Sequence, residues 1–240
     1  MKLADFDANP KLPVHRPPSI NEELIARHFS RDGDDAVLVA MRNAVHDARL
    51  AADEIARRHE TILQDELRTP IARQRAARQM AQRLLAGVSD KLNRAHRQAL
   101  TAVAEVESLA PPPPKNIEAT MAAQEMRGLL RSMTSKERNK VISDAIAADD
   151  NGVLSAVMHG HALASGLGPL EQNALRLRWR KSQYPQQVER RDRLVKASDD
   201  LERIVHLFVA WTDGLTDVKA ITVAEARENE ARSAEKIALP

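Results

Sequence analysis

PIARQRAARQMAQRLLAGVSDKLNRAHRQALTAVAEVESLA, residues 70–110, is the stretch that decides the fold. It follows Thr69, and a threonine cap with proline at the first helical position is typical of a helix start. Apolar residues then recur at alternating steps of four and three: Ala81, Leu85, Val88, Leu92, Ala95, Ala99, Ala102, Val106 and Leu109. This heptad spacing predicts a long helix with a seam for another helix along one side.

The preceding stretch carries a second seam of the same kind. Asp34 and Asp35 can cap a helix that runs to about Arg68. Its apolar positions are Leu38, Met41, Val45, Ala48, Ala52, Ile55 and Ile62. Residues 34–110 are therefore predicted to be a long-helix coiled-coil region. The junction at 69–70 leaves two arrangements open, an antiparallel helical hairpin and a kinked rod.

The remaining chain is divided by its prolines. Residues 1–33 hold Pro10, Pro13, Pro17 and Pro18, which predict an extended arm followed by a short helix. The proline run within 111–115 predicts a stiff polyproline linker. Residues 116–240 are expected to form a C-terminal helical domain. Within it, Thr134–Glu137 and Thr222–Glu225 match the capping box and predict two helix starts.

Composition favours an all-α fold. Aromatic residues make up 2 % of the 240 residues, whereas Ala, Leu, Arg and Glu, which suit helices, are abundant. The net charge of +2 is nearly balanced, and there is no cysteine, which excludes disulfides and thiolate sites. No apolar run reaches the roughly 18 residues of a membrane span, and the first residues lack the apolar core of a secretory signal. Synthesis in the cytoplasm is expected.

The sequence contains no motif of an enzyme active site. The P-loop, the dinucleotide-binding glycine fingerprint, the HExxH metal motif and the GxSxG elbow are all absent. His159 and His161, separated by one residue, are the strongest metal candidates, but the sequence places no third ligand beside them. We therefore predict no catalytic, cofactor-binding or metal-binding residue, and a non-enzymatic protein.

Clustered cations suggest a second kind of function. Residues 68–97 contain eight cations and one acid, Asp90. The candidate nucleic-acid contacts are Arg73, Arg75, Arg78, Arg83, Arg94 and Arg97. The alternatives are a solvated face, or pairing with acids of the preceding helix, which are Asp53, Glu54, Glu60, Asp65 and Glu66.

Large apolar side chains are scarce, so those present are candidate core or interface anchors. These candidates are Trp179, Trp211, Phe208, Leu85 and Leu92. Trp179 lies within a second basic cluster at 176–181, where it can stack on a base, although a role as an anchor is favoured.

The segment 137–178 resembles a pattern in poorly characterised helical virion and assembly proteins of tailed bacteriophages and prophages. The LSGL of that pattern stands here as Ala164-Ser165-Gly166-Leu167, and His159-Gly160 replaces its usual Ala-Pro. The resemblance implies a structural protein of the head interior or head–tail region that ends in the virion. Its expected partners are further copies of itself and other virion proteins. A nucleic-acid-binding or packaging accessory protein that uses the basic helix 68–97 is the alternative.

Overall fold

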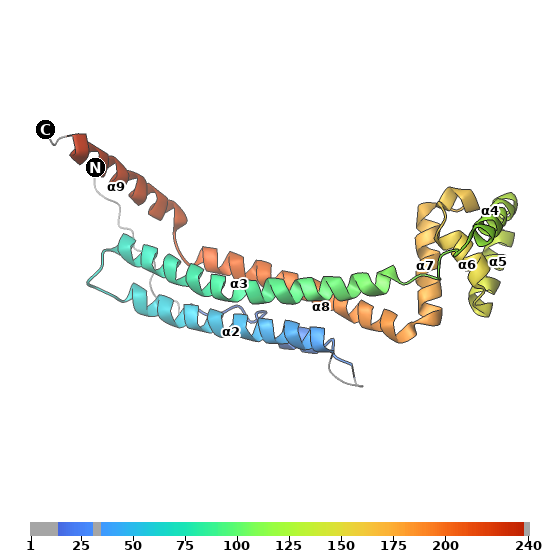
Figure 1. Ribbon diagram of the computed structural model, residues 1–240. Helices are drawn as coiled ribbons and strands as arrows, with labels where there is room; N and C mark the ends of the chain where they lie inside the picture. The colour runs from blue at the N-terminus through green and yellow to red at the C-terminus, as the bar shows by residue number, and fades with distance from the viewer. Residues whose placement is uncertain (1–13, 31–34, 238–240) are drawn as a thin grey trace. The chain divides into compact units, whose positions relative to one another are not determined.

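The computed structural model describes residues 14–30 and 35–237, and within these ranges every regular element is helical (Figure 1). No β-strand occurs in this part of the chain, so the predicted all-α fold is confirmed. Residues 1–13 of the predicted arm lie outside the described residues. The elements are α1 (Glu23–Ala26), α2 (Ala36–Leu63), α3 (Pro70–Ser108), α4 (Ile117–Ser132), α5 (Ser135–Ala148), α6 (Asn151–Met158), the 3-10 helix η1 (Ala162–Ser165), α7 (Pro169–Gln183), α8 (Pro185–Gly214) and α9 (Val218–Ile237).

The chain divides into two compact units. The first comprises residues 1–100 and 193–240, and the second comprises residues 101–192. Helices α3 and α8 each contribute residues to both units, because each helix runs through a unit boundary. The proline run of 111–115 lies inside the second unit.

In the first unit, α2 and α3 lie alongside each other (Figure 1). Lys91 of α3 donates to the carboxylate of Asp47 in α2 at 2.6 Å. Closer to the connection, Arg73 of α3 donates to the carbonyl of Leu63 at 2.7 Å. Both pairs are centred on residues 68–69 of the sequence.

The core of the first unit is rich in small side chains. Its buried alanines include Ala48, Ala52, Ala77, Ala81, Ala95 and Ala99. Among the described residues, Phe208 of α8 is the largest side chain that is fully buried. Because alanine buries little area, helices must approach closely for this unit to hold together.

Helix α9 begins earlier than the sequence predicted. The second capping box, at Thr222–Glu225, is not the start of a helix, so that prediction is wrong. Instead the carboxylate of Asp217 accepts from the Ala220 N–H at 2.9 Å and caps the helix one turn earlier. A capping-box pattern inside an existing helix has no free N–H groups to satisfy.

The second unit packs around α6. All side chains from Val153 to Met158 are buried, and α4, α5, η1 and α7 surround them. The predicted capping box at the start of α5 is confirmed: Thr134 and Glu137 satisfy each other's backbone N–H groups.

A buried arginine joins three segments of this unit. Arg138 donates to the carbonyls of Leu130 and Met133 at 2.9 and 3.0 Å, and to the carbonyl of Gly166. Gly166 has φ +70°, and a Cβ built there would lie 2.9 Å from the Arg138 guanidinium carbon. Both features favour glycine at this position.

Candidate interaction surfaces

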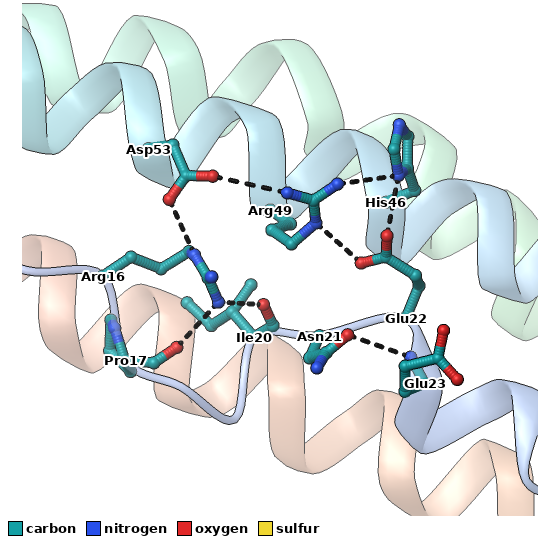
Figure 2. Close-up of polar contacts among 9 residues, drawn as sticks. All are labelled: Arg16, Pro17, Ile20, Asn21, Glu22, Glu23, His46, Arg49 and Asp53. Carbon is teal, nitrogen blue, oxygen red and sulfur yellow. Dashed lines mark hydrogen bonds and ion pairs between the residues drawn. The ribbon is translucent and has the colours of Figure 1, made fainter.

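A connected polar cluster fastens the segment before α2 to that helix (Figure 2). The carboxylate of Glu22 accepts from His46 Nδ1 at 2.9 Å and from Arg49 Nε at 2.8 Å. Next along α2, Asp53 accepts from Arg16 Nε at 2.7 Å. Arg49 lies between the two carboxylates, with Nη1 at 3.6 Å from Asp53. The side chains of His46, Arg49 and Asp53 in α2 therefore hold both ends of the segment 16–22.

The electrostatics of this cluster argue against acid–base chemistry. Burial acts to raise the pKa of Glu22, but hydrogen bonds from His46, its own backbone and Arg49 outweigh it and lower the pKa to about 2. A carboxylate this acidic stays charged at neutral pH and neither donates nor takes up a proton there. The cluster is thus suited to holding the chain in place.

A second clamp secures α1 to α8 within the first unit. Asp200 is buried and accepts from Arg27 Nη2 at 2.6 Å and from His28 Nε2 at 2.7 Å. Between the two clamps, Ile20 and Ile25 are fully buried. No local pattern marks either clamp, since their members lie up to 173 residues apart in the chain.

The six predicted nucleic-acid contacts do not share one environment. Arg73 is bound to the Leu63 carbonyl, and Arg75 donates to Glu228 of α9 at 2.8 Å. Arg78 lines a groove between α3 and α9. The other three, Arg83, Arg94 and Arg97, are exposed.

Those three exposed arginines lie on one side of α3. At 100° for each residue, Arg94 and Arg97 fall within about 40° of Arg83. Asp90 lies between them on the same exposed side. Three cations and one acid form a modest positive surface.

Of the acids proposed as partners of these cations, Asp65 does pair with one of them, Arg68, at 3.0 Å. Two others pair with different arginines, Asp53 with Arg16 and Glu54 with Arg57 at 2.8 Å. Another of these cations, Lys91, pairs with Asp47, an acid of α2, at 2.6 Å.

Two arginines of the second basic cluster bind backbone carbonyls of the second unit. Arg176 donates to the carbonyl of Met158 at 2.7 Å, and Arg180 donates to the carbonyls of Leu109 and Glu107. Burial lowers the pKa of Arg180. The nearby charges of Arg176 and Arg191 also lower it, whereas the charge of Glu107 acts to raise it. These side chains fasten α7 to the ends of α3 and α6.

The predicted anchors lie within the chain's own packing. Trp179 is buried in the second unit, with its ring 5.6 Å from that of Tyr184. Phe208 and Leu92 are buried in the first unit, and Trp211 and Leu85 are half-buried there. Helices of this chain bury Trp179, Phe208 and Leu92.

An exposed apolar surface occurs instead at the start of α4, and sequence reasoning did not single it out. Ile117 is 79 % exposed and Met121 is 57 % exposed, one turn apart. A hollow of about 470 Å³ adjoins them, lined also by Pro114, Lys115, Asn116, Thr120 and Gln124. We call these residues the α4 surface. The available signal was an isoleucine and a methionine four residues apart, directly after a helix cap at Asn116.

Within the described ranges, no group of three or more His, Cys, Asp or Glu side chains could hold a metal ion. His159 Nε2 instead bonds the carbonyl of Pro111 at 2.6 Å, and His161 is exposed. No helix among the described residues has both the length and the apolar character needed to cross a membrane. The chain matches no protein-family model, no curated protein and no solved structure.

Proposed function

We propose that this chain is a non-enzymatic assembly protein that works by contacting further copies of itself. The observation that carries this proposal is the α4 surface, where two large apolar side chains are left exposed beside a hollow. Contiguous exposed apolar surface, rimmed by polar groups, is typical of a protein–protein contact.

The shape of the α4 surface favours a helix as its occupant. Ile117, Met121, Gln124 and Gly128 follow one another at steps of four, three and four, which is the spacing of a helix-packing seam. Nothing lies within 4 Å of a Cβ built at Gly128, so another backbone has room to approach. A second copy offers the same seam, and a two-fold pair of α4 helices is the simplest closed arrangement.

The particle in which the protein works is proposed from sequence resemblance. The segment 137–178 is similar to virion and assembly proteins of tailed phages, which suggests a place in the head interior or head–tail region. We further propose that α2 and α3 form the helical hairpin of this assembly protein. The Lys91–Asp47 and Arg73–Leu63 contacts support the hairpin over the kinked rod.

Solution mass tests this function. We expect light scattering after gel filtration to give a discrete oligomer at both low and high salt, because apolar burial is not screened. The double variant Ile117→Asp/Met121→Asp should be monomeric. Leu67→Asp is the matched control, since Leu67 is 98 % exposed in the α2–α3 connection and lies outside the α4 surface. A monomeric parent protein, or a double variant that still assembles, overturns the proposal.

The alternative function is non-specific nucleic-acid binding, and the specific observation in its favour is the exposed side of α3. Arg83, Arg94 and Arg97 are available there for phosphates. Each phosphate contact contributes about −0.9 to the slope of log affinity against log salt, so three arginines give at most about −3. Affinity for duplex DNA that is absent, or independent of salt, rules this alternative out.

A further inference from the structure

Helices α3 and α9 enclose a groove of about 330 Å³ in the first unit. Its α3 wall is made of donors: Arg75, Arg78, Gln79 and Gln82. Its α9 wall is made of Val218, Ile221, Thr222 and Glu225. Two guanidinium groups and two amides therefore face one acid across a space large enough for a small anion.

The groove has donors that are not in use. Glu228 places its two carboxylate oxygens 2.8 and 2.9 Å from Arg75 Nη1. Glu225 reaches only to 3.9 Å from Arg75 Nε, which is too long for a hydrogen bond. Nε and Nη2 of Arg75 are both buried without a hydrogen-bond partner. These two groups form the side of the guanidinium that binds an oxyanion through two parallel bonds.

Arg78 adds a second cation one turn away. Its side chain makes no hydrogen bond or ion pair with any of the residues that the structure describes. Side chains three positions apart on a helix lie about 5–6 Å apart at Cβ, so Arg75 and Arg78 can hold one phosphate or two adjacent ones. The amides of Gln79 and Gln82 supply neutral donors beside them.

We propose that the α3–α9 groove binds backbone phosphates of a nucleic acid through Arg75 and Arg78, and that in its absence Glu228, with Glu225 nearby, pairs with Arg75. This rests on the alternative function above and extends it from the exposed arginines to a built site. Carboxylates and phosphates compete for an arginine because both present oxygens at the spacing of its N–H groups. The carboxylates of α9 then compete with the phosphates of the nucleic acid for the arginines of α3.

Helix α9 is held loosely enough to be displaced. Among its described side chains, Ile221 is the one that is buried. Its remaining ties to α3 are the pairs of Arg75 with Glu225 and Glu228, and an N–H bond from Asp217 to Gln74 at 3.3 Å. Glu225 and Glu228 are about half exposed, and ion pairs of such side chains are weak. A polyanion that offers several phosphates can therefore replace them.

The test measures binding of a fluorescently labelled 30-base-pair DNA duplex to the full chain by anisotropy, between 50 and 200 mM salt. Glu225→Gln/Glu228→Gln keeps the size of both side chains and removes their charge, and it should tighten binding about 2- to 10-fold. Arg75→Gln/Arg78→Gln should weaken binding and reduce the salt slope by about 1–2. Glu230→Gln is the matched control, since Glu230 is exposed on the same helix and is not part of the groove.

The outcomes separate this inference from the function on which it rests. Tighter binding by the α9 variant, with weaker binding by the Arg75/Arg78 variant, supports the groove. If Arg83→Gln/Arg94→Gln/Arg97→Gln abolishes binding while the groove variants bind like the parent, the alternative function stands and the groove inference fails. If neither the parent protein nor the α9 variant binds DNA, both fail. Circular dichroism of each variant excludes loss of fold as the cause.

Discussion

Replacing Glu22 by glutamine should release the segment before α2, and the size of the effect follows from the pKa of this carboxyl group. The pKa falls from 4.5 to about 2 in the folded protein, for the reasons given above. That difference corresponds to about 3 kcal/mol at 1.36 kcal/mol for each pKa unit. Because water screens a partly buried group, we expect about 1–2 kcal/mol of this to be lost in Glu22→Gln at pH 7.

Hydrogen exchange measures this loss directly. The N–H groups of Ile25 and Ala26 both donate to the carbonyl of Glu22 at 3.0 Å, so they exchange only when the segment opens. A loss of 1–2 kcal/mol raises the open population about 5- to 30-fold, and the protection factors of these amides should fall by the same factor. Glu23→Gln is the control, because in Figure 2 the Glu23 carboxylate makes none of the marked contacts.

The pH dependence of this loss of protection tests whether the charge of Glu22 holds the segment. Since the folded pKa of Glu22 is depressed, its stabilisation is present above pH 4.5 and disappears as the pH falls from about 5 towards 2. The difference in protection between Glu22→Gln and the parent protein should shrink over that range. A difference that stays constant from pH 7 to pH 2.5 would show that packing, and not charge, holds the segment, and the electrostatic reasoning would be wrong.

Three further substitutions test the packing of each unit. Arg138→Ala leaves three backbone carbonyls without their donor and should lower the stability of the second unit by about 3–5 kcal/mol, measured by urea denaturation. Gly166→Ala should cost more than about 1 kcal/mol in the same assay, because φ is positive there and the added methyl meets the Arg138 guanidinium; an unchanged midpoint contradicts this. Burial lowers the pKa of His59 despite its bond to the Leu215 carbonyl, so stability should decline as the pH falls below about 6.5, and His59→Leu should remove that decline.

The sequence predicted what depends on local pattern. The seam of α3 is one such case: Ala81, Val88, Leu92 and Ala99 are buried, because a repeat of four and three turns these residues to one side of a helix whatever lies opposite. The capping box at Thr134 is another, since both of its partners lie within one turn.

The sequence did not predict what depends on which surfaces meet. Ile117 and Met121 look like core residues of α4, and only the arrangement of the second unit leaves them exposed. Asp200 looks like one more acid in a charged helix, yet it is buried beside Arg27, 173 residues away. Periodicity states which residues share a side of a helix, but it carries no information on whether another element covers that side.

The arginines explain why a count of charges is a poor guide to a candidate nucleic-acid surface. A chain with few aromatic residues buries little area per helix contact, and here arginine supplies part of the missing cohesion by donating to backbone carbonyls. Arg127 donates to Ala156, Arg176 to Met158 and Arg180 to Leu109. An arginine used in this way cannot also bind a phosphate without breaking its bond, so the cluster at 176–181 is a poor site despite its charge. The exposed side of α3 and its groove with α9 are better candidates, because Arg83 and Arg94 are exposed and Nε and Nη2 of Arg75 have no hydrogen-bond partner.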